Sequence, residues 1–153
     1  MDSCFVACGC NDPEGVTTSD LDRYTDRIEN VLSDEKGRKL FRNFMFSSNF
    51  KHGRKVLDLW EKIEKLIHYR ENADGTASPT FSKDLDKVMV AAERIEVIDY
   101  VLLQTFISTV SDNKDRKEIN DALHLLKLEA TKALASEYDA FRSRYVHYNS
   151  RNN

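Results

Sequence analysis

The chain has 153 residues, a formal net charge of −3, and 41% hydrophobic against 32% charged residues. This composition is globular and excludes a disordered chain, and the length suits one ordinary domain. Two prolines and five glycines supply too little turn chemistry for a many-stranded sandwich or barrel. Because the sequence has neither a run of 18 apolar residues nor a secretory signal, we expect an intracellular protein.

The first ten residues carry all three cysteines of the chain: Cys4, Cys8 and Cys10. No other cysteine is present to pair with them, and three thiolates without a downstream Cys or His cluster make a poor zinc site. One interpretation is S-acylation by palmitate, which would bring the chain to a membrane; Asp2 excludes N-myristoylation. The alternative is a flexible tail over residues 1–18 whose cysteines are unmodified.

Apolar residues recur at helical spacing through the first half of the chain. Thr17, Thr18 and Ser19 offer N-caps for one helix through about residue 32, and Gly37 separates it from a short second helix. A third helix is expected over about 54–69. The expected inner faces are Leu21, Tyr24, Ile28 and Val31; then Leu40, Phe41 and Phe44; then Leu59, Trp60, Ile63, Leu66 and Ile67.

Residues 71–82 contain Gly75 and Pro79 and are interpreted as a long loop, because a domain boundary there would leave two fragments too small to fold alone. A fourth helix is expected from residue 83. Residues 99–110 contain only one charged side chain, which favours a helix in the middle of the core. Frequent β-branched residues leave a strand as the alternative for that segment.

The C-terminal part is expected to hold a long helix over about 115–135 and a final helix with Tyr138, Phe141 and Tyr145. The pattern therefore predicts an all-α domain over residues 19–148, followed by a disordered tail at 149–153.

Two blocks of sequence resemble the regulator-of-G-protein-signalling (RGS) family. The first block matches a family pattern of Leu, a short polar stretch, Gly, Phe-x-x-Phe and Leu-x-Phe-Trp, with Leu59 replacing the usual aromatic: Leu32, Gly37, Phe41, Phe44, Leu57 and Trp60. The second resembles the family's last helix, with one residue fewer between Phe and Ser: Tyr138, Phe141, Ser143 and Tyr145. The blocks are separated about as in the family, so the resemblance covers residues 19–148.

The resemblance implies a single-domain RGS-like bundle of about nine helices. Five aromatic anchors would then share one core: Phe41, Phe44, Trp60, Tyr138 and Phe141. It also implies binding to a G-protein α subunit (Gα) or a signalling scaffold. Active family members accelerate GTP hydrolysis by holding the Gα switch loops in their transition-state arrangement, without supplying a catalytic arginine.

The positions that contact Gα in the family are changed in this sequence. Lys55 and Val56 stand where the family commonly has Glu and Asn, and Ser136 and Ala140 stand where it often has Asp and Arg. Valine cannot orient a glutamine or a water, and lysine reverses the charge. We therefore expect an interaction domain with weak or no GTPase-activating activity, in which Val56→Asn leaves the fold intact. An authentic GTPase activator is the alternative.

A basic stretch without any acidic residue extends from Lys36 to Leu57. Its cations are Lys36, Arg38, Lys39, Arg42, Lys51, Arg54 and Lys55. The rest of the chain then carries a charge of −10, which makes the molecule dipolar. With acylated cysteines, this stretch would supply the two signals that stable membrane anchoring requires, as in a membrane-surface adaptor. The alternative is a solvated face that acidic neighbours balance.

Signs of an enzyme are absent from the sequence. The four histidines are scattered without metal-ligand spacing, and neither a glycine-rich phosphate loop nor a G-x-S-x-G elbow occurs. We expect no catalytic residues, no metal, no cofactor and no small-molecule substrate. A pI of about 5.8 also argues against nucleic acid. The expected partner is a protein, and the expected location is the cytoplasm, with an anionic inner membrane face as a second surface.

Overall fold

The computed structural model describes residues 15–69, 79–112 and 115–151, and every regular element among them is an α-helix. The all-α prediction is confirmed for these residues, and the strand alternative for residues 99–110 is wrong. The chain divides into two compact units: unit 1 combines residues 1–54 with 134–153, and unit 2 comprises residues 55–133. Each unit has its own buried core.

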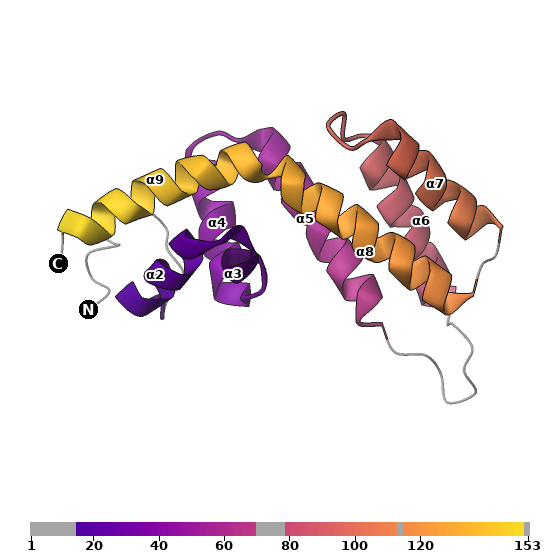
Figure 1. The fold of residues 1–153 in the computed structure, drawn as a ribbon, viewed down its shortest axis with the longest axis horizontal. Helices are drawn as coiled ribbons and strands as arrows, with labels where there is room; N and C mark the ends of the chain where they lie inside the picture. Colours follow the sequence, from indigo (N-terminus) through magenta and orange to yellow (C-terminus); the bar gives the residue numbers. More distant parts are fainter. Residues whose placement is uncertain (1–14, 70–78, 113–114, 152–153) are drawn as a thin grey trace. The chain divides into compact units, whose positions relative to one another are not determined.

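Unit 1 joins the two ends of the chain. Its helices are α2 (Thr18–Asp26), α3 (Ile28–Leu32), α4 (Glu35–Ser47) and α9 (Ala135–Arg151). Figure 1 shows α9 running across α2 and α4, and the contacts of these three helices agree. α9 continues to Arg151, beyond residue 148, where we expected the helical domain to end.

The first segment forms two helices rather than the single helix that we expected. Thr17 and Asp20 form a reciprocal capping box at the start of α2, and Arg27 then leaves the helical region with φ −145° and ψ 147°. The backbone turns there so that α3 follows in a new direction. Asn30 holds the break by donating its side-chain amide to the carbonyl of Arg23 at 2.9 Å.

Gly37 lies inside α4, although the sequence suggested that it separates two helices. A Cβ at this position would lie 2.5 Å from the carbonyl oxygen of Val31 and 3.1 Å from the ring of Tyr24. A side chain there would therefore collide with the backbone of α3. The glycine permits α3 and α4 to pack closely, at the cost of a weaker local helix propensity.

An aromatic cluster fills the core of unit 1. The Phe41 ring packs edge-on against Phe141 with centroids 5.2 Å apart, and Phe44 meets Phe141 in the same way at 5.6 Å. Tyr138 and Tyr145 extend the cluster along α9. Such edge-to-face pairs add to the stabilisation from burial, so residues about 100 positions apart in sequence are joined into one core.

Buried tyrosine hydroxyls fasten α2 to its neighbours. Tyr138 donates to the backbone carbonyl of Tyr24 at 2.8 Å, and burial raises the pKa of Tyr138 to about 12. The hydroxyl of Tyr24 donates to Asp34 at 2.6 Å, and Arg23 donates to the same carboxylate at 2.9 Å. Burial alone would raise the pKa of Asp34, but these hydrogen bonds outweigh it and the pKa is lowered.

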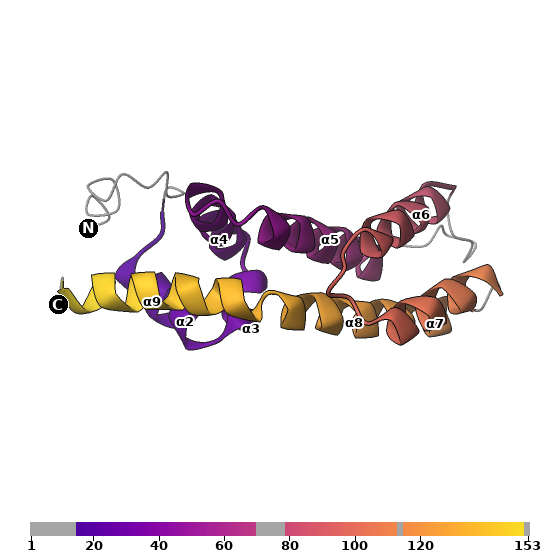
Figure 2. The same ribbon diagram turned by 90° about the horizontal axis from the view of Figure 1, so that it is seen from above.

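Unit 2 consists of four helices: α5 (Lys51–Ile67, which begins in unit 1), α6 (Pro79–Glu93), α7 (Tyr100–Ser111) and α8 (Arg116–Ala133). In Figure 2, α7 lies beside α8, and the residue contacts agree that α7 packs mainly on α8. The core is largely aliphatic. Its buried residues include Leu57, Leu59, Trp60, Ile63, Leu66, Leu85, Val88, Leu103, Phe106, Leu123, Leu126 and Ala130.

Trp60 belongs to unit 2, whereas the other four expected anchors belong to unit 1. All five side chains are buried, and the anchors that we expected in one core are divided between the two compact units. The indole N–H donates to Thr131 on α8 at 3.2 Å, and Lys127 lies 5.4 Å from the ring centroid. Within unit 2, Trp60 therefore mainly connects α5 to α8.

α7 is less buried than its apolar sequence predicts. Only Leu103 and Phe106 are buried, while Tyr100 and Val101 are 72% and 70% exposed. The expectation of a helix in the middle of the core is therefore wrong. α7 packs on α8 and α6 through one face, and the opposite face has no covering element within unit 2.

Candidate interaction site

Val56 is a predicted contact position that the structure shows to be inaccessible to a partner. Its side chain is 0% exposed in the core of unit 2, so it has no surface for a partner to contact. An asparagine there would bury an amide away from water, and we no longer expect Val56→Asn to leave the fold intact. Lys55, its neighbour on α5, is exposed.

The other two predicted contact positions lie on α9 in unit 1. Ser136 is exposed and donates its hydroxyl to Glu137 at 3.1 Å, while Ala140 is half-buried. The RGS family often has Asp and Arg at these two positions, and serine and alanine supply neither a carboxylate nor a guanidinium. The predicted set is thus divided between two units, with Lys55 and Val56 in one and Ser136 and Ala140 in the other.

Several cations of the basic stretch lie close to carboxylate or carbonyl oxygens. Lys36 lies 3.4 Å from Asp20, and Lys39 lies 3.4 Å from Glu35. Arg38 donates to the carbonyl of Leu32 at 2.7 Å. The remaining members are Arg42, which has further contacts, Arg54, which lies over the Phe46 ring, and the exposed Lys51 and Lys55. The positive charge of the basic stretch is therefore partly neutralised in the folded chain.

Cys4, Cys8 and Cys10 lie outside the described residues. Within the described part of the chain, no helix combines the length and the apolar character that crossing a bilayer requires. Across the same residues, no three His, Cys, Asp or Glu side chains gather into a possible metal site.

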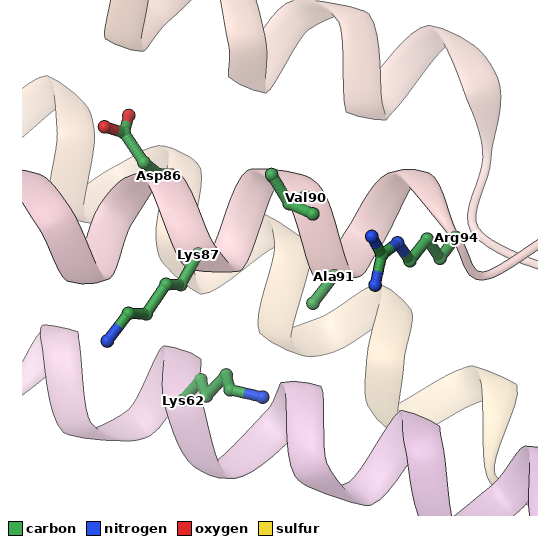
Figure 3. Close-up of a pocket in the computed structure, with 6 residues that line it drawn as sticks. All are labelled: Lys62, Asp86, Lys87, Val90, Ala91 and Arg94. Carbon is green, nitrogen blue, oxygen red and sulfur yellow. The ribbon is translucent and has the colours of Figure 1, made fainter.

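A cationic groove runs between α5 and α6 in unit 2, and sequence reasoning did not find it. It has a volume of about 390 Å³ and is lined by Lys62 from α5 together with Asp86, Lys87, Val90, Ala91 and Arg94 from α6. Figure 3 shows Lys62 and Lys87 in the space between the two helices, while the carboxylate of Asp86 points to the other side of α6. Lys87 and Asp86 therefore point to different sides of α6, although both line the groove.

A second hollow extends the groove along the same two helices. It has a volume of about 170 Å³, shares Lys62 and Lys87 with the first, and adds Lys65 and Asp84. Lys87 is 3.8 Å from Asp84, a loose surface ion pair. In the described part of the chain, Lys62, Lys65 and Arg94 form no ion pair. The groove thus carries an excess of positive charge over an apolar floor that Val90 and Ala91 provide.

The sequence contains no local signal of this groove, because its cations come from two helices and lie about 20 to 30 residues apart in the chain. On α6 alone, Asp84 and Lys87 form the surface ion pair that helical spacing predicts. Only the packing of α6 beside α5 brings Lys62 and Lys65 to the same place. Chemically, lysine and arginine side chains around an open groove suit an anionic segment, with carboxylates or phosphates near the rim.

Residues of the two sequence blocks that resemble the RGS family meet within unit 1, where Phe41 and Phe44 contact Phe141, whereas Leu57 and Trp60 of the first block belong to unit 2. No protein-family model, no curated protein and no solved structure matches the chain. Membership of the RGS family therefore stays a prediction.

Proposed function

We propose that the chain is an RGS-like protein-interaction module that binds a Gα subunit or a signalling scaffold and has weak or no GTPase-activating activity. One observation carries the binding part of this proposal: the groove between α5 and α6 presents Lys62, Lys87 and Arg94 around about 390 Å³ of open space. We assign it an acidic segment of the partner protein. The RGS-like part is supported by the aromatic cluster that joins α4 to α9.

The geometry of the groove favours a protein ligand. The groove has apolar residues at its floor and charged residues at its rim. Protein interfaces show the same arrangement, with apolar contacts at the centre and charges around them. Among the described residues, Lys62 and Arg94 form no ion pair that would have to break when an acidic partner arrives. Complementary charge at such a rim mainly raises the association rate and the specificity.

The lack of GTPase activation follows from the contact positions. In the family, an asparagine at the position of Val56 reaches the Gα switch region, but Val56 is completely buried here. Ser136 and Ala140 supply neither the carboxylate nor the guanidinium of the family pattern. A domain that binds Gα without these groups has no means of holding the switch loops in their transition-state arrangement.

Binding to a panel of purified Gα subunits tests the proposal, with affinities measured by biolayer interferometry. The double variant Lys62→Glu/Arg94→Glu reverses two charges in the groove at exposed positions, so the fold should persist. We expect about a tenfold loss of affinity, because each exposed ion pair contributes up to about 1 kcal/mol. The control Lys51→Glu/Lys132→Glu makes the same charge change outside the groove and should stay within about twofold.

Single-turnover GTP hydrolysis on the same Gα subunits tests the absence of activation. We expect the hydrolysis rate of each bound Gα to be unchanged by the domain. Acceleration on any one of them would show an authentic GTPase activator instead. Equal affinities of the groove variant and the native chain would contradict the groove as the binding site, and binding to no Gα would leave only the scaffold.

A further inference from the structure

A second groove, apolar rather than cationic, lies between α7 and α8 of unit 2. It has a volume of about 290 Å³ and is lined by Asp99, Val101, Leu102, Thr105, Phe106, Ala122 and Leu125. Val101 and Leu125 stand at its edges and are 70% and 56% exposed. Tyr100, which is next to Val101 in sequence, and Leu128, which lies one turn after Leu125, are also exposed. Exposed apolar surface of this extent at a groove is typical of a docking site.

The rim of this groove is acidic. Asp99 is the only charged side chain among the lining residues, and α7 itself contains no charged residue. On α8, Glu118 and Glu129 lie one turn before Ala122 and one turn after Leu125 on the same face, and Asp121 is adjacent. Within the described residues, these three α8 carboxylates form no ion pair.

By helical spacing, Lys127 and Arg116 of α8 lie on the side away from the groove. Lys127 points to the other side of α8, where it pairs with Glu64 on α5 at 2.6 Å. Arg116 lies over the rings of Tyr69 and Phe81 and donates to the carbonyl of Tyr69 at 3.0 Å. Lys132 lies one turn after Leu128 on the groove side of α8, where the carboxylates of Asp99, Glu118, Asp121 and Glu129 outnumber it, and Lys117 lies near the start of the helix. The groove therefore combines an apolar floor with a negative rim.

We propose that this groove binds a basic amphipathic helix of a partner protein. Two helices packed side by side leave a furrow into which a third helix can lay an apolar stripe, with anchors at i, i+3, i+4 and i+7. The apolar anchors of that helix would fill the space between Val101, Phe106 and Leu125. Its flanking lysines or arginines would meet Asp99, Asp121 and the glutamates of α8.

The same charges argue against the two other occupants of an apolar groove. A second copy of this chain would oppose one acidic rim to another across a two-fold axis, and like charges in contact are unfavourable. A membrane with anionic lipids would be repelled by the same carboxylates. The proposal is independent of the α5–α6 groove, because the two grooves have no lining residue in common.

A synthetic helical peptide with leucines at i, i+3, i+4 and i+7 and lysines elsewhere is the probe, and its binding to the full chain is followed by fluorescence anisotropy. A twin peptide with glutamate in place of lysine tests the charge. We expect the lysine peptide to bind at least tenfold more tightly than its twin, and added salt to weaken it.

Variants at exposed positions locate the binding site without disturbing the fold. Val101→Ser/Leu125→Ser removes the apolar edges and should weaken the lysine peptide about tenfold. Asp99→Ser/Asp121→Asn removes two rim charges, retains an N-cap residue for α7, and should weaken it about threefold. Val146→Ser, an equally simple change on the exposed surface of unit 1, should leave the affinity within twofold.

Three results would overturn the proposal. The first is absence of lysine-peptide binding to a chain that circular dichroism shows to be folded. The second is equal binding of the lysine and glutamate peptides, which would show apolar contact without charge selection. The third is a dimer in analytical ultracentrifugation that Val101→Ser/Leu125→Ser dissociates, which would make a second copy the occupant. Loss of Gα binding in Lys62→Glu/Arg94→Glu with unchanged peptide binding would separate this groove from the proposed function.

Discussion

Units 1 and 2 achieve their stability in different ways. In unit 1, aromatic rings from α4 and α9 interlock, and tyrosine hydroxyls and an arginine bind backbone carbonyls of α2, as with Arg142 and the carbonyl of Thr25 at 2.7 Å. In unit 2, aliphatic side chains form most of the core and Trp60 is the only tryptophan. Both grooves described above lie in unit 2.

The difference indicates a division of roles. Directional contacts such as ring edges and buried hydroxyls specify one arrangement of the helices in unit 1. The helices of unit 2 are packed by less directional aliphatic contacts, and α6 and α7 each keep a face that the unit does not cover. We infer that unit 1 mainly holds the two ends of the chain together and that unit 2 mainly binds.

The largest expected effect on stability comes from the aromatic cluster of unit 1. Phe141 is fully buried against Phe41 and Phe44, so Phe141→Ala should lower the free energy of unfolding by about 3–5 kcal/mol. Urea denaturation followed by far-ultraviolet circular dichroism measures the loss, while Trp60 fluorescence reports on unit 2. Val146→Ala, an exposed change on the same helix, should cost less than about 0.5 kcal/mol. Equal losses for the two variants would contradict an aromatic core.

An intermediate effect is expected from the close approach of α3 and α4. Gly37→Ala places a Cβ 2.5 Å from the backbone oxygen of Val31, and we expect a loss of about 1–3 kcal/mol despite the better helix propensity of alanine. Gly53→Ala is the matched control, because its Cβ would meet only side-chain atoms of Met45 and Glu137, which can move. Thermal unfolding compares the two. A Gly37→Ala protein as stable as the Gly53→Ala protein would show that α3 moves freely.

The smallest expected effect concerns the carboxylate that joins α2 to α4. The pKa of Asp34 is lowered from its ordinary value of 3.8 in the folded protein. Its contribution is therefore complete above about pH 4 and is lost as the pH falls through the folded-state pKa. Asp34→Asn keeps an N-cap residue for α4 but removes the charge, and we expect a loss of about 1 kcal/mol at neutral pH.

The pH dependence separates this role from capping alone. Between pH 5 and pH 3, the native chain should lose more stability than Asp34→Asn in urea titrations, because only the native chain has this carboxylate to protonate. Asp86→Asn, an exposed carboxylate of unit 2, is the control for a charge change. Parallel curves for native chain and Asp34→Asn would mean that Asp34 acts only as a cap.

Helix content and most inward-facing residues were predictable because they depend on local periodicity. In the three predicted stripes of the first half, Ile28 and Ile67 are partly exposed and every other member is buried. The break at Arg27 was missed, because an extended arginine leaves no pattern in an apolar repeat that continues across it. Gly37 was misread as a separator, since only a neighbouring backbone shows why a glycine is needed within a helix.

The candidate binding surfaces were much less predictable than the helices. The basic stretch was visible in the sequence, yet its members pair with residues from other segments, such as Lys36 with Asp20. Val56 was taken for a surface position because the resemblance was read at one position without knowing which face of α5 is buried. The cationic groove was not visible, because Lys62 and Arg94 belong to different helices.

Periodicity, composition and capping residues are properties of neighbours along the chain, and they were sufficient to establish an all-helical protein with buried aromatic residues. Which residues share a core, and which apolar faces are left open, depend on contacts between distant segments. The tertiary structure therefore decided that Phe41 packs with Phe141 while Trp60 packs with α8, and that α7 leaves Val101 exposed. Burial is a property of the packed helices together, and no single helix carries enough information to set it.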